Sequence, residues 1–463
     1  MNDDSKMEIT VVGGGLAGSE AAWQAAEKGA QVTLYEMRPR VETGAHRTDY
    51  LGELVCSNSL GSILPDRATG QLLFELRRLN SLVIRIADET SVPAGSALAV
   101  DRELFARKIT ETIQNHPRIT VIREEVSQIP AGTTVIASGP LTSASLMDSL
   151  STLVGAESLF FYDAIAPIIY RESIRMDVAF KGSRYGRGVE EEGDYINCPL
   201  TKEQYETFVT NLLLAQRIEL HAFEKDILSG VKAGSGFFFE RCLPVEILAG
   251  RDIQALAFGP MRPVGLTDPR TGRWPYAVVQ LRQDDIADSM YNMVGFQTNL
   301  TFTEQARILR LIPGLEEAEF ARYGQMHRNT FICSPRFLTR ALNHRTRTEL
   351  FFAGQLIGVE GYAGNIASGL LAGLNAVRHL REQEPLILPV ETMIGALFDY
   401  ITRADPGSFQ PMKANFGLLP AIPMQKKITK RQKHELIASN ARQAMDEYMN
   451  QLESNPHAES KHE

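Results

Sequence analysis

The chain has 463 residues, more than one hydrophobic core usually organises, so two or three domains are expected. It is 44% hydrophobic and 22% charged, which suits a soluble globular protein. The formal net charge of −8 taken alone disfavours a nucleic-acid partner, although binding depends on where charges cluster rather than on their sum.

Neither the first residues of the chain nor its cysteines suggest secretion. The first residues, MNDDSKME, are acidic and polar, so they predict no signal peptide, and no charge-free apolar run is long enough to predict a membrane span. The cysteines contain no CxxC pair, which argues against a zinc ribbon and a dithiol reductase, and no metal site is predicted. Reduced thiols in the cytoplasm are expected. The cysteines are Cys56, Cys198, Cys242 and Cys333.

The strongest local pattern spans residues 8–36. EITVV is an apolar, β-branched run that predicts a buried strand, and G-x-G-x-x-G follows it directly. LAGSEAAWQAAEKG predicts a helix that Gly29 ends, and QVTLYE predicts a second strand that ends at Glu36. Strand, turn, helix, strand and terminal acid in this order predict a dinucleotide-binding unit.

Each position of this unit has a physical task. Gly13 permits the tight turn, Gly15 lets the backbone approach a pyrophosphate, and Gly18 allows the helix to pack closely on the strand. The helix N-terminus faces the phosphates, and Glu36 can accept the ribose hydroxyls. The candidate cofactor residues here are Gly13, Gly14, Gly15, Leu16, Ala17, Gly18 and Glu36.

Two later stretches favour FAD over NAD(P) or S-adenosylmethionine. TTVIASGP (133–140) predicts a short strand that ends in small residues, which let backbone approach a ligand. Residues 348–380 predict a strand that ends at Gly354, a glycine-rich loop and a helix from about Asn365, whose amides can stabilise a reduced flavin. No second G-x-G-x-x-G lies between the N-terminal unit and residues 348–380, so NAD(P)H, if used, does not bind through a second motif of this kind. The further candidate cofactor residues are Gly139, Gly354, Gln355 and Gly361.

This return to the nucleotide fold near the C-terminus resembles flavoproteins of the glutathione-reductase type. The predicted class is α/β, with a Rossmann-type FAD-binding domain interrupted by a mixed α/β insertion. Within the insertion we expect a helix over 201–226, strands over 276–285 and 290–300, and a helix capped at Thr303 and ended by Pro313-Gly314. The predicted division is 1–170 (FAD domain, first part), 171–328 (insertion for substrate and RNA), 329–450 (FAD domain, second part, and C-terminal helices) and 451–463 (disordered tail).

Three further stretches leave alternatives open. Arg241 can favour a thiolate at Cys242 in FFERCLPVEIL, but packing of this cysteine against phenylalanines is as good an interpretation. The basic clusters are interpreted as solvated surfaces. The loop over 258–283 fits a polyanion, a stacked ring or solvent. The residues concerned are Lys181, Arg184 and Arg187; Lys426, Lys427, Lys430, Arg431 and Lys433; and Arg262, Arg270, Arg273 and Trp274.

The chain closely resembles the folate- and FAD-dependent tRNA uracil-5-methyltransferases. The resemblance covers nearly all of it, from the first predicted strand to FQPMKANFGLLP. It rests on GELVCSNSL, FFERCLPVEIL, FGPMRPVGL, QLRQD, VGFQTNL, RYGQMHRNTFI and LFFAGQLIGVEGY. The resemblance implies an enzyme that makes 5-methyluridine in the T-loop of tRNA. The carbon would come from 5,10-methylenetetrahydrofolate, and NAD(P)H would reduce the FAD. A close sister group is thought to methylate ribosomal RNA, which is the alternative target.

The chemistry of such a family explains a need for two cysteines. A thiolate that adds to uracil C6 makes C5 nucleophilic, so that C5 can attack an electrophilic methylene. A base then removes the C5 proton, and hydride from the reduced flavin completes the methyl group. The resemblance places Cys242 as the attacking thiol. It places Cys56 near the flavin, as general base or as the thiol that holds the methylene–flavin adduct. The target base must be unstacked from its loop. Cys198 and Cys333 match no catalytic stretch and are interpreted as packing.

The sequence departs from the family at two places. The family usually reads EGYVESAASGL, whereas here Tyr362 is followed by AGNIASGL, and Arg241 stands where glycine is common. Three other functions compete. Larger FAD proteins that modify the wobble uridine with a GTPase partner carry a long helical C-terminal extension, for which this chain is too short. A flavin oxidoreductase acting on a small molecule would not need the cysteine stretches. An RNA-binding flavoprotein without turnover is suggested by Gly364-Asn365.

Overall fold

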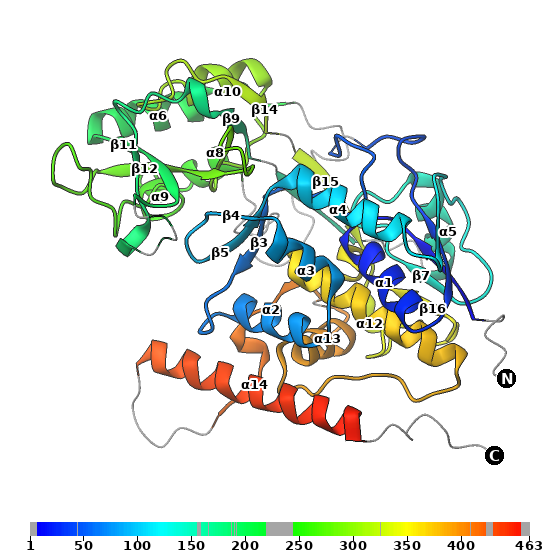
Figure 1. Cartoon of the computed structure of the whole chain (residues 1–463). Helices are drawn as coiled ribbons and strands as arrows, with labels where there is room; N and C mark the ends of the chain where they lie inside the picture. Colours follow the sequence, from blue (N-terminus) through cyan, green and yellow to red (C-terminus); the bar gives the residue numbers. More distant parts are fainter. Residues whose placement is uncertain are drawn as a thin grey trace.

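The structure is a computed structural model. It describes residues 7–43, 45–154, 159–164, 166–186, 188, 190, 192–218, 244–324, 326–407, 409–422 and 429–454. Its first body is built on a five-stranded parallel sheet in the order β16–β7–β1–β2–β6 (Figure 1). The strands are β16 Leu350–Phe352, β7 Thr134–Ile136, β1 Glu8–Val12, β2 Gln31–Tyr35 and β6 Ile119–Ile122. The predicted strands near residues 8, 31 and 134 are therefore confirmed.

Helices α1 (Leu16–Glu27) and α12 (Tyr362–Leu380) pack tightly on each other beside this sheet. A β-carbon at Gly369 would lie 2.0 Å from the Ala17 carbonyl oxygen, and one at Gly373 would lie 2.5 Å from that of Ala21. Only glycine allows this approach of the two backbones. The contact joins segments far apart in sequence and brings the N-termini of both helices to one edge of the sheet.

The start of α12 differs from the prediction. The helix begins at Tyr362 rather than near Asn365, because Gly361 with φ of 80° is the residue that turns the chain into the first helical turn. The strand predicted to end at Gly354 is β16, and it ends two residues earlier, at Phe352. Gly354 itself has φ of 80° and belongs to the turn that follows the strand.

The first body has further helices among the described residues. They are α2 Ala68–Arg78, α3 Leu82–Glu89, α4 Arg102–Gln114, α5 Ala144–Val154, α11 Ser334–Phe337, α13 Met393–Arg403 and α14 Lys430–Ser454. Two small sheets complete it, one of β3 Ser59–Ser62, β5 Ala97–Val100 and β4 Ser91–Val92, the other of β17 Val359–Glu360 and β18 Met412–Lys413. Among the described helices, none combines the length and apolarity needed to cross a membrane.

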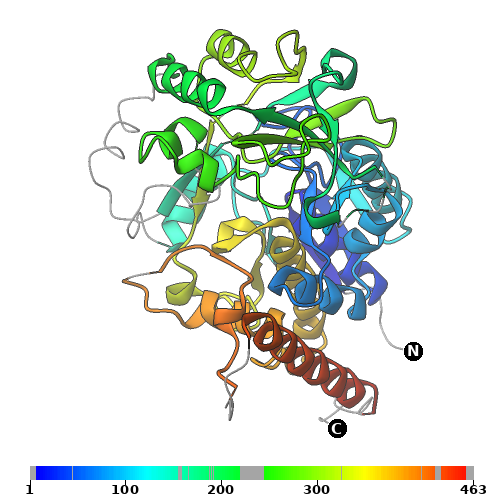
Figure 2. The same cartoon turned by 90° about the vertical axis from the view of Figure 1, so that its left-hand side faces the viewer.

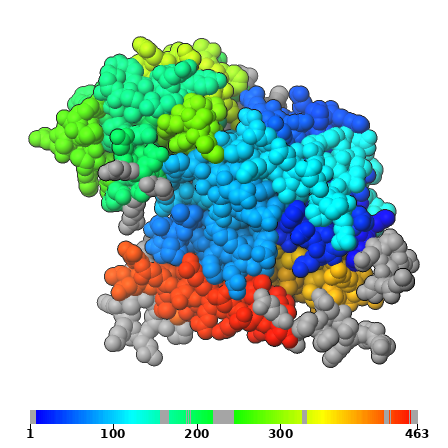
Figure 3. Space-filling view, viewed as in Figure 1, coloured from blue at the N-terminus to red at the C-terminus, as the bar shows by residue number. Residues whose placement is uncertain are grey.

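The second body is a six-stranded antiparallel sheet with helices, and it has a hydrophobic core of its own. We call it the insertion domain, residues 168–322. Figures 2 and 3 show it projecting from one end of the molecule, while α14 forms the other end. In sheet order the strands are β10 Phe180–Lys181, β11 Tyr195–Leu200, β12 Ala277–Gln283, β13 Met290–Met293, β9 Ile168–Tyr170 and β14 Phe320–Arg322. The helices are α6 Lys202–Leu214, α8 Val245–Ala249, α9 Ala255–Phe258 and α10 Phe302–Leu309.

Several predicted bounds inside the insertion domain are wrong. Helix α6 ends at Leu214, and residues 219–243 of the longer predicted helix and loop lie outside the described residues. The N-cap of α10 is Thr301, whose side chain accepts a hydrogen bond from the Glu304 amide, rather than Thr303. Strand β13 is only four residues long. Every residue of β12 is buried, because this central strand is covered on both faces.

The chain passes between the bodies along a two-stranded antiparallel ladder of β8 (Leu159–Ala164) and β15 (Met326–Phe331). Strand β9, which belongs to the insertion sheet, begins at Ile168, close to the predicted boundary at residue 171. The numbered domain boundaries stay a prediction. Residues 451–454 of the predicted disordered tail are helical, because α14 continues to Ser454, and the rest of the tail lies outside the described residues.

Candidate active site

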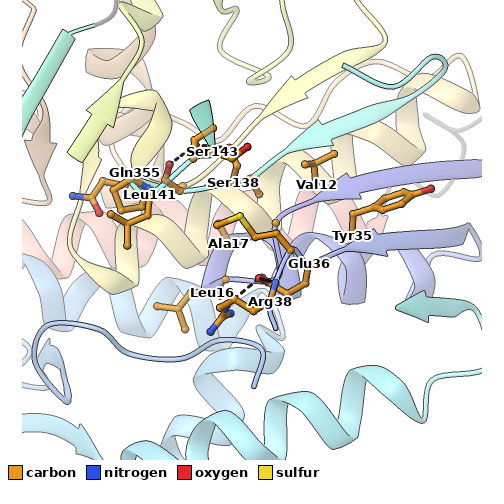
Figure 4. A pocket seen from close by; sticks show the side chains of 18 of the residues that line it. Val12, Leu16, Ala17, Tyr35, Glu36, Arg38, Ser138, Leu141, Ser143 and Gln355 are labelled. Atoms are coloured by element: carbon orange, nitrogen blue, oxygen red, sulfur yellow. Dashed lines mark hydrogen bonds and ion pairs between the residues drawn. The ribbon is translucent and has the colours of Figure 1, made fainter. Parts of the chain in front are cut away.

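A cleft opens where the parallel strands β1, β2, β7 and β16 end. In open α/β folds, ligands bind at this carboxyl edge of the sheet. Figure 4 shows Glu36 and Arg38 joined on one side of the cleft, with Ser138 and Ser143 on the other. Of the residues predicted to contact a cofactor, those that line the cleft are Gly13, Gly15, Leu16, Ala17, Glu36, Gly139, Gly354 and Gln355.

The glycines around the cleft, including those of the G-x-G-x-x-G motif, have different surroundings. Gly15 has φ of −72°, and a β-carbon there would meet no protein atom within 4 Å, so its open side faces the cleft. A β-carbon at Gly18 would lie 1.7 Å from the Gly13 carbonyl oxygen, which makes this a packing position. Gly14 donates its amide to Glu36, and Gly361 caps α12. Gly14, Gly18 and Gly361 are not among the residues that line the cleft.

The carboxylate of Glu36 is already engaged within the protein. Oε2 accepts from the Gly14 amide at 2.9 Å, and Oε1 accepts from the amide and Nε of Arg38 at 3.0 and 2.9 Å. Burial acts to raise the pKa of Glu36, but the hydrogen bonds and charge of Arg38 hold this pKa below its usual range. Since a carboxylate can accept about four hydrogen bonds, roughly one position is left for a ribose hydroxyl. That role of Glu36 stays a prediction.

The sequence reasoning missed the residues that hold Glu36 and shape this end of the cleft. Arg38 also donates through Nη1 to Glu53 Oε2 at 3.0 Å. His46 lines the cleft, and burial, together with the charge of Arg38, lowers its pKa to about 4, so the imidazole is neutral at physiological pH. Glu53 belongs to the stretch GELVCSNSL, but no local pattern pairs it with Arg38 or His46, because only the folded loop brings the three together.

The cleft residues fit a dinucleotide such as FAD. The open side of Gly15 and the N-terminus of α1 provide a cradle for a pyrophosphate. At the start of α12, Asn365 lines the same cleft, and its buried Oδ1 atom has no hydrogen-bond partner among the described residues. A buried polar atom without a partner is uncommon and indicates a group that binds there. When bound, FAD would be held by the loops after β1, β2, β7 and β16.

The predicted catalytic Cys56 lies beside this cleft. Its amide donates to the hydroxyl of Tyr362, a cleft residue, at 2.9 Å. Its carbonyl accepts from Arg102 Nη2 at 3.0 Å. The backbone of this cysteine is therefore fixed between α12 and the start of α4. The motif LFFAGQLIGVEGY contains Tyr362, but nothing in the sequence pairs it with Cys56.

The other cysteines differ in their placement. Cys198 and Cys333 are buried in the two cores, in agreement with a packing role, and burial raises the pKa of the Cys198 thiol. The predicted nucleophile Cys242 and its neighbour Arg241 lie outside the described residues. In the described part of the chain, no cluster of three His, Cys, Asp or Glu side chains could hold a metal.

The basic clusters prove partly neutralised. Lys181 pairs with Glu190 at 3.3 Å, and Arg184 donates to Gln280 Oε1 and to a backbone carbonyl. Arg431 pairs with Glu435 at 2.8 Å. Arg187, Lys426 and Lys427 lie outside the described residues, as does the side chain of Lys430. In the 258–283 loop, Trp274 is 60% exposed and Arg270 pairs with Asp268.

Comparison with known proteins identifies the family. Residues 8–384 match the family described as glucose inhibited division protein A. A relative from Natranaerobius thermophilus is 53% identical over 96% of this chain and 99% of its own length, and one from Anoxybacillus flavithermus is 52% identical over 96% and 100%. Both are named methylenetetrahydrofolate--tRNA-(uracil-5-)-methyltransferase TrmFO. The chain belongs to the family of these TrmFO relatives.

Solved structures support the fold of the TrmFO family member described here. Aquifex aeolicus GidA in two crystal forms has TM-scores of 0.65 and 0.64 and is 17% and 16% identical. Each comparison covers 97% of this chain, and 78% or 76% of the other. At this identity the likeness concerns the fold alone. Together with the parallel sheet, it confirms the predicted α/β class with a Rossmann-type FAD-binding domain and a mixed α/β insertion.

Proposed function

We propose that this TrmFO family member methylates uridine C5 in the T-loop of tRNA. The carbon donor is 5,10-methylenetetrahydrofolate, the reductant is FAD in its reduced form, and NAD(P)H regenerates it. The observation that carries the proposal is that about half of all positions are identical, over nearly the full length, in relatives named for this reaction. The cleft beside Cys56 supports it, because a thiol next to a flavin site is what this chemistry requires. Location in the cytoplasm stays a prediction.

The chain's own residues divide the chemistry. The thiolate of Cys242 adds to uracil C6, and C5 then bonds to the methylene carbon of the folate. Loss of the C5 proton drives cleavage of the bond between this carbon and the folate nitrogen, which leaves an exocyclic methylene on C5. The Cys242 thiolate leaves C6 when hydride reaches that methylene. Cys56, fixed by Tyr362 and Arg102, handles the C5 proton or the methylene carbon. When bound, reduced FAD supplies the hydride that completes the methyl group. Arg38 and Glu36 orient the loop around the cofactor cleft, and the N-termini of α1 and α12 direct amides toward bound anionic groups.

Nucleoside analysis of RNA from cells lacking the gene tests the target directly. We expect 5-methyluridine to disappear from the T-loop of tRNA and to return when the wild-type gene is restored. Loss of the methyl group from ribosomal RNA alone would favour the same chemistry on the alternative target. Purified protein that reduces its flavin but binds no RNA would contradict the proposal and favour an oxidoreductase acting on a small molecule.

The basic residues just before and at the start of α14 provide a second prediction. Neutralising Lys426, Lys427, Lys430 and Arg431 together should weaken tRNA binding. It should also reduce the slope of log affinity against log salt by about 2 to 3, because each charge that contacts a phosphate contributes about 0.7–0.9. Arg431 will contribute least, since Glu435 already pairs with it. Filter binding over a salt series measures both effects.

A matched control neutralises exposed cations on the insertion domain. Lys202 and Arg307 already pair with Glu206 and Glu304, so their replacement by glutamine should leave the slope unchanged. An unchanged slope in the α14 variant together with a reduced slope in the control would place the RNA on the insertion domain instead.

A further inference from the structure

The segment that carries Cys56 is held by two arginines from separate parts of the fold, the partly buried Arg102 and the buried Arg282. Arg102, at the start of α4, donates to the carbonyls of Leu54 at 2.7 Å and Cys56 at 3.0 Å. Arg282, at the end of β12 in the insertion domain, donates to Ser57 Oγ at 2.7 Å and to Asn58 Oδ1 at 2.9 Å. The cysteine therefore lies between two guanidinium groups that hold its neighbours on both sides.

The two arginines differ in how their charge is balanced. Arg102 forms an ion pair with Asp284, in which Nε of Arg102 lies 3.0 Å from Oδ1 and 2.8 Å from Oδ2 of the carboxylate. Arg282 is 8% exposed, and both side chains that it contacts, Ser57 and Asn58, are neutral. Within the described part of the chain no carboxylate forms an ion pair with it. A buried cation without a counter-charge is costly, so a negative charge nearby is strongly favoured.

Cys56 is the group in this environment that can supply that negative charge reversibly. Its thiol interacts electrostatically with both Arg102 and Arg282. The other charged or titratable groups around the pair are Asp284, already engaged by Arg102, and the hydroxyls of Tyr195 and Tyr362. Arg322 adds a further positive charge near Arg102 and Tyr362. Cations beside a thiol favour the thiolate, which is the reactive form.

We propose that Arg282 is a positioning residue that fixes the Ser57–Asn58 segment and keeps the Cys56 thiol ionised. Because Arg282 belongs to the insertion domain, the docking of this domain on the flavin domain would set the reactivity of Cys56. The use of the thiolate in methyl transfer rests on the proposed function, but the ionisation itself does not. It is measured by alkylation in the absence of RNA and folate, so the two ideas can fail separately.

The test is the rate of Cys56 alkylation by iodoacetamide in the purified full-length protein, followed by peptide mass spectrometry over a series of pH values. Arg282→Met should move the midpoint of the rate–pH curve upward by about one pH unit or more, since removing a nearby opposite charge has effects of this size. Arg282→Lys, which keeps the charge, should restore most of the wild-type midpoint. Arg184→Met is the matched control. It removes another insertion-domain guanidinium bonded to a side-chain amide, and should leave the midpoint unchanged.

A second pair of variants works without removing Arg282, in case Arg282→Met fails to fold. Ser57→Asp places a carboxylate beside the guanidinium and should raise the midpoint, whereas Ser57→Asn, similar in shape and neutral, should not. Thermal unfolding confirms that each variant is folded. An unchanged midpoint in folded Arg282→Met or Ser57→Asp overturns the proposal. Equal shifts in Arg282→Lys and Arg282→Met would also overturn it, since they would show that shape rather than charge matters.

Discussion

Gly15→Val should give a folded protein that purifies without its yellow colour. The backbone of Gly15 is in the extended region, which any residue adopts, and a β-carbon there meets no protein atom within 4 Å. The added side chain therefore disturbs only what binds in the cleft. A clash of this kind costs about 1–3 kcal/mol or more, which corresponds to roughly 5- to 150-fold weaker FAD binding or a larger loss. Flavin absorbance per chain and FAD titration by fluorescence quenching measure the effect.

Other glycines of the same turn provide the contrast. Gly13→Ala should destabilise the fold itself, because Gly13 has φ of 105° and its β-carbon would lie 2.5 Å from the Ala137 carbonyl oxygen. Gly15→Ala, with a smaller side chain, should weaken FAD binding less than Gly15→Val while leaving thermal unfolding of the apoprotein unchanged. If Gly15→Val keeps a full flavin spectrum, the cofactor does not lie against this turn.

The two cysteines should separate in an RNA-trapping experiment. RNA that carries 5-fluorouridine at the target should form a covalent complex with the wild-type protein, because fluorine does not leave as a proton does. Cys242→Ala should abolish both trapping and methylation while the flavin stays bound. Cys56→Ala should lower methylation by about 100- to 10,000-fold, the usual contribution of a general base, and still allow trapping. Gel shift under denaturing conditions detects the complex.

This experiment tests which of the two cysteines is the nucleophile. Arg241 is the neighbour that could favour the thiolate of Cys242, and both residues lie outside the described residues. Cys56 has two arginines beside it, the partly buried Arg102 and the buried Arg282, so an arginine neighbour does not distinguish the two thiols. Exchanged outcomes, with trapping lost in Cys56→Ala and kept in Cys242→Ala, would reverse the roles. Trapping in the double variant would remove both from the nucleophile role.

The local units of the cofactor domain were predictable from the sequence. The strand–turn–helix–strand unit over residues 8–36 was predictable because hydrophobic periodicity and glycine positions act over short distances along the chain. Bounds were wrong where one residue decides them. Gly361 starts α12 earlier than the small-residue pattern suggested, and Thr301 rather than Thr303 caps α10, since either threonine could precede the helix in sequence.

The assembly of the site depends on contacts between segments that are far apart in the sequence. Arg38 reaches Glu36 from a loop, Tyr362 meets Cys56 across 306 positions of sequence, and Arg282 reaches Asn58 across 224. None of these pairs leaves a local pattern, because side-chain hydrogen bonds between distant segments depend on how two bodies dock. Residue types at catalytic positions are written in the sequence. The charges that surround Cys56 follow from burial and from the contact between the insertion domain and the flavin domain, which exist only after folding.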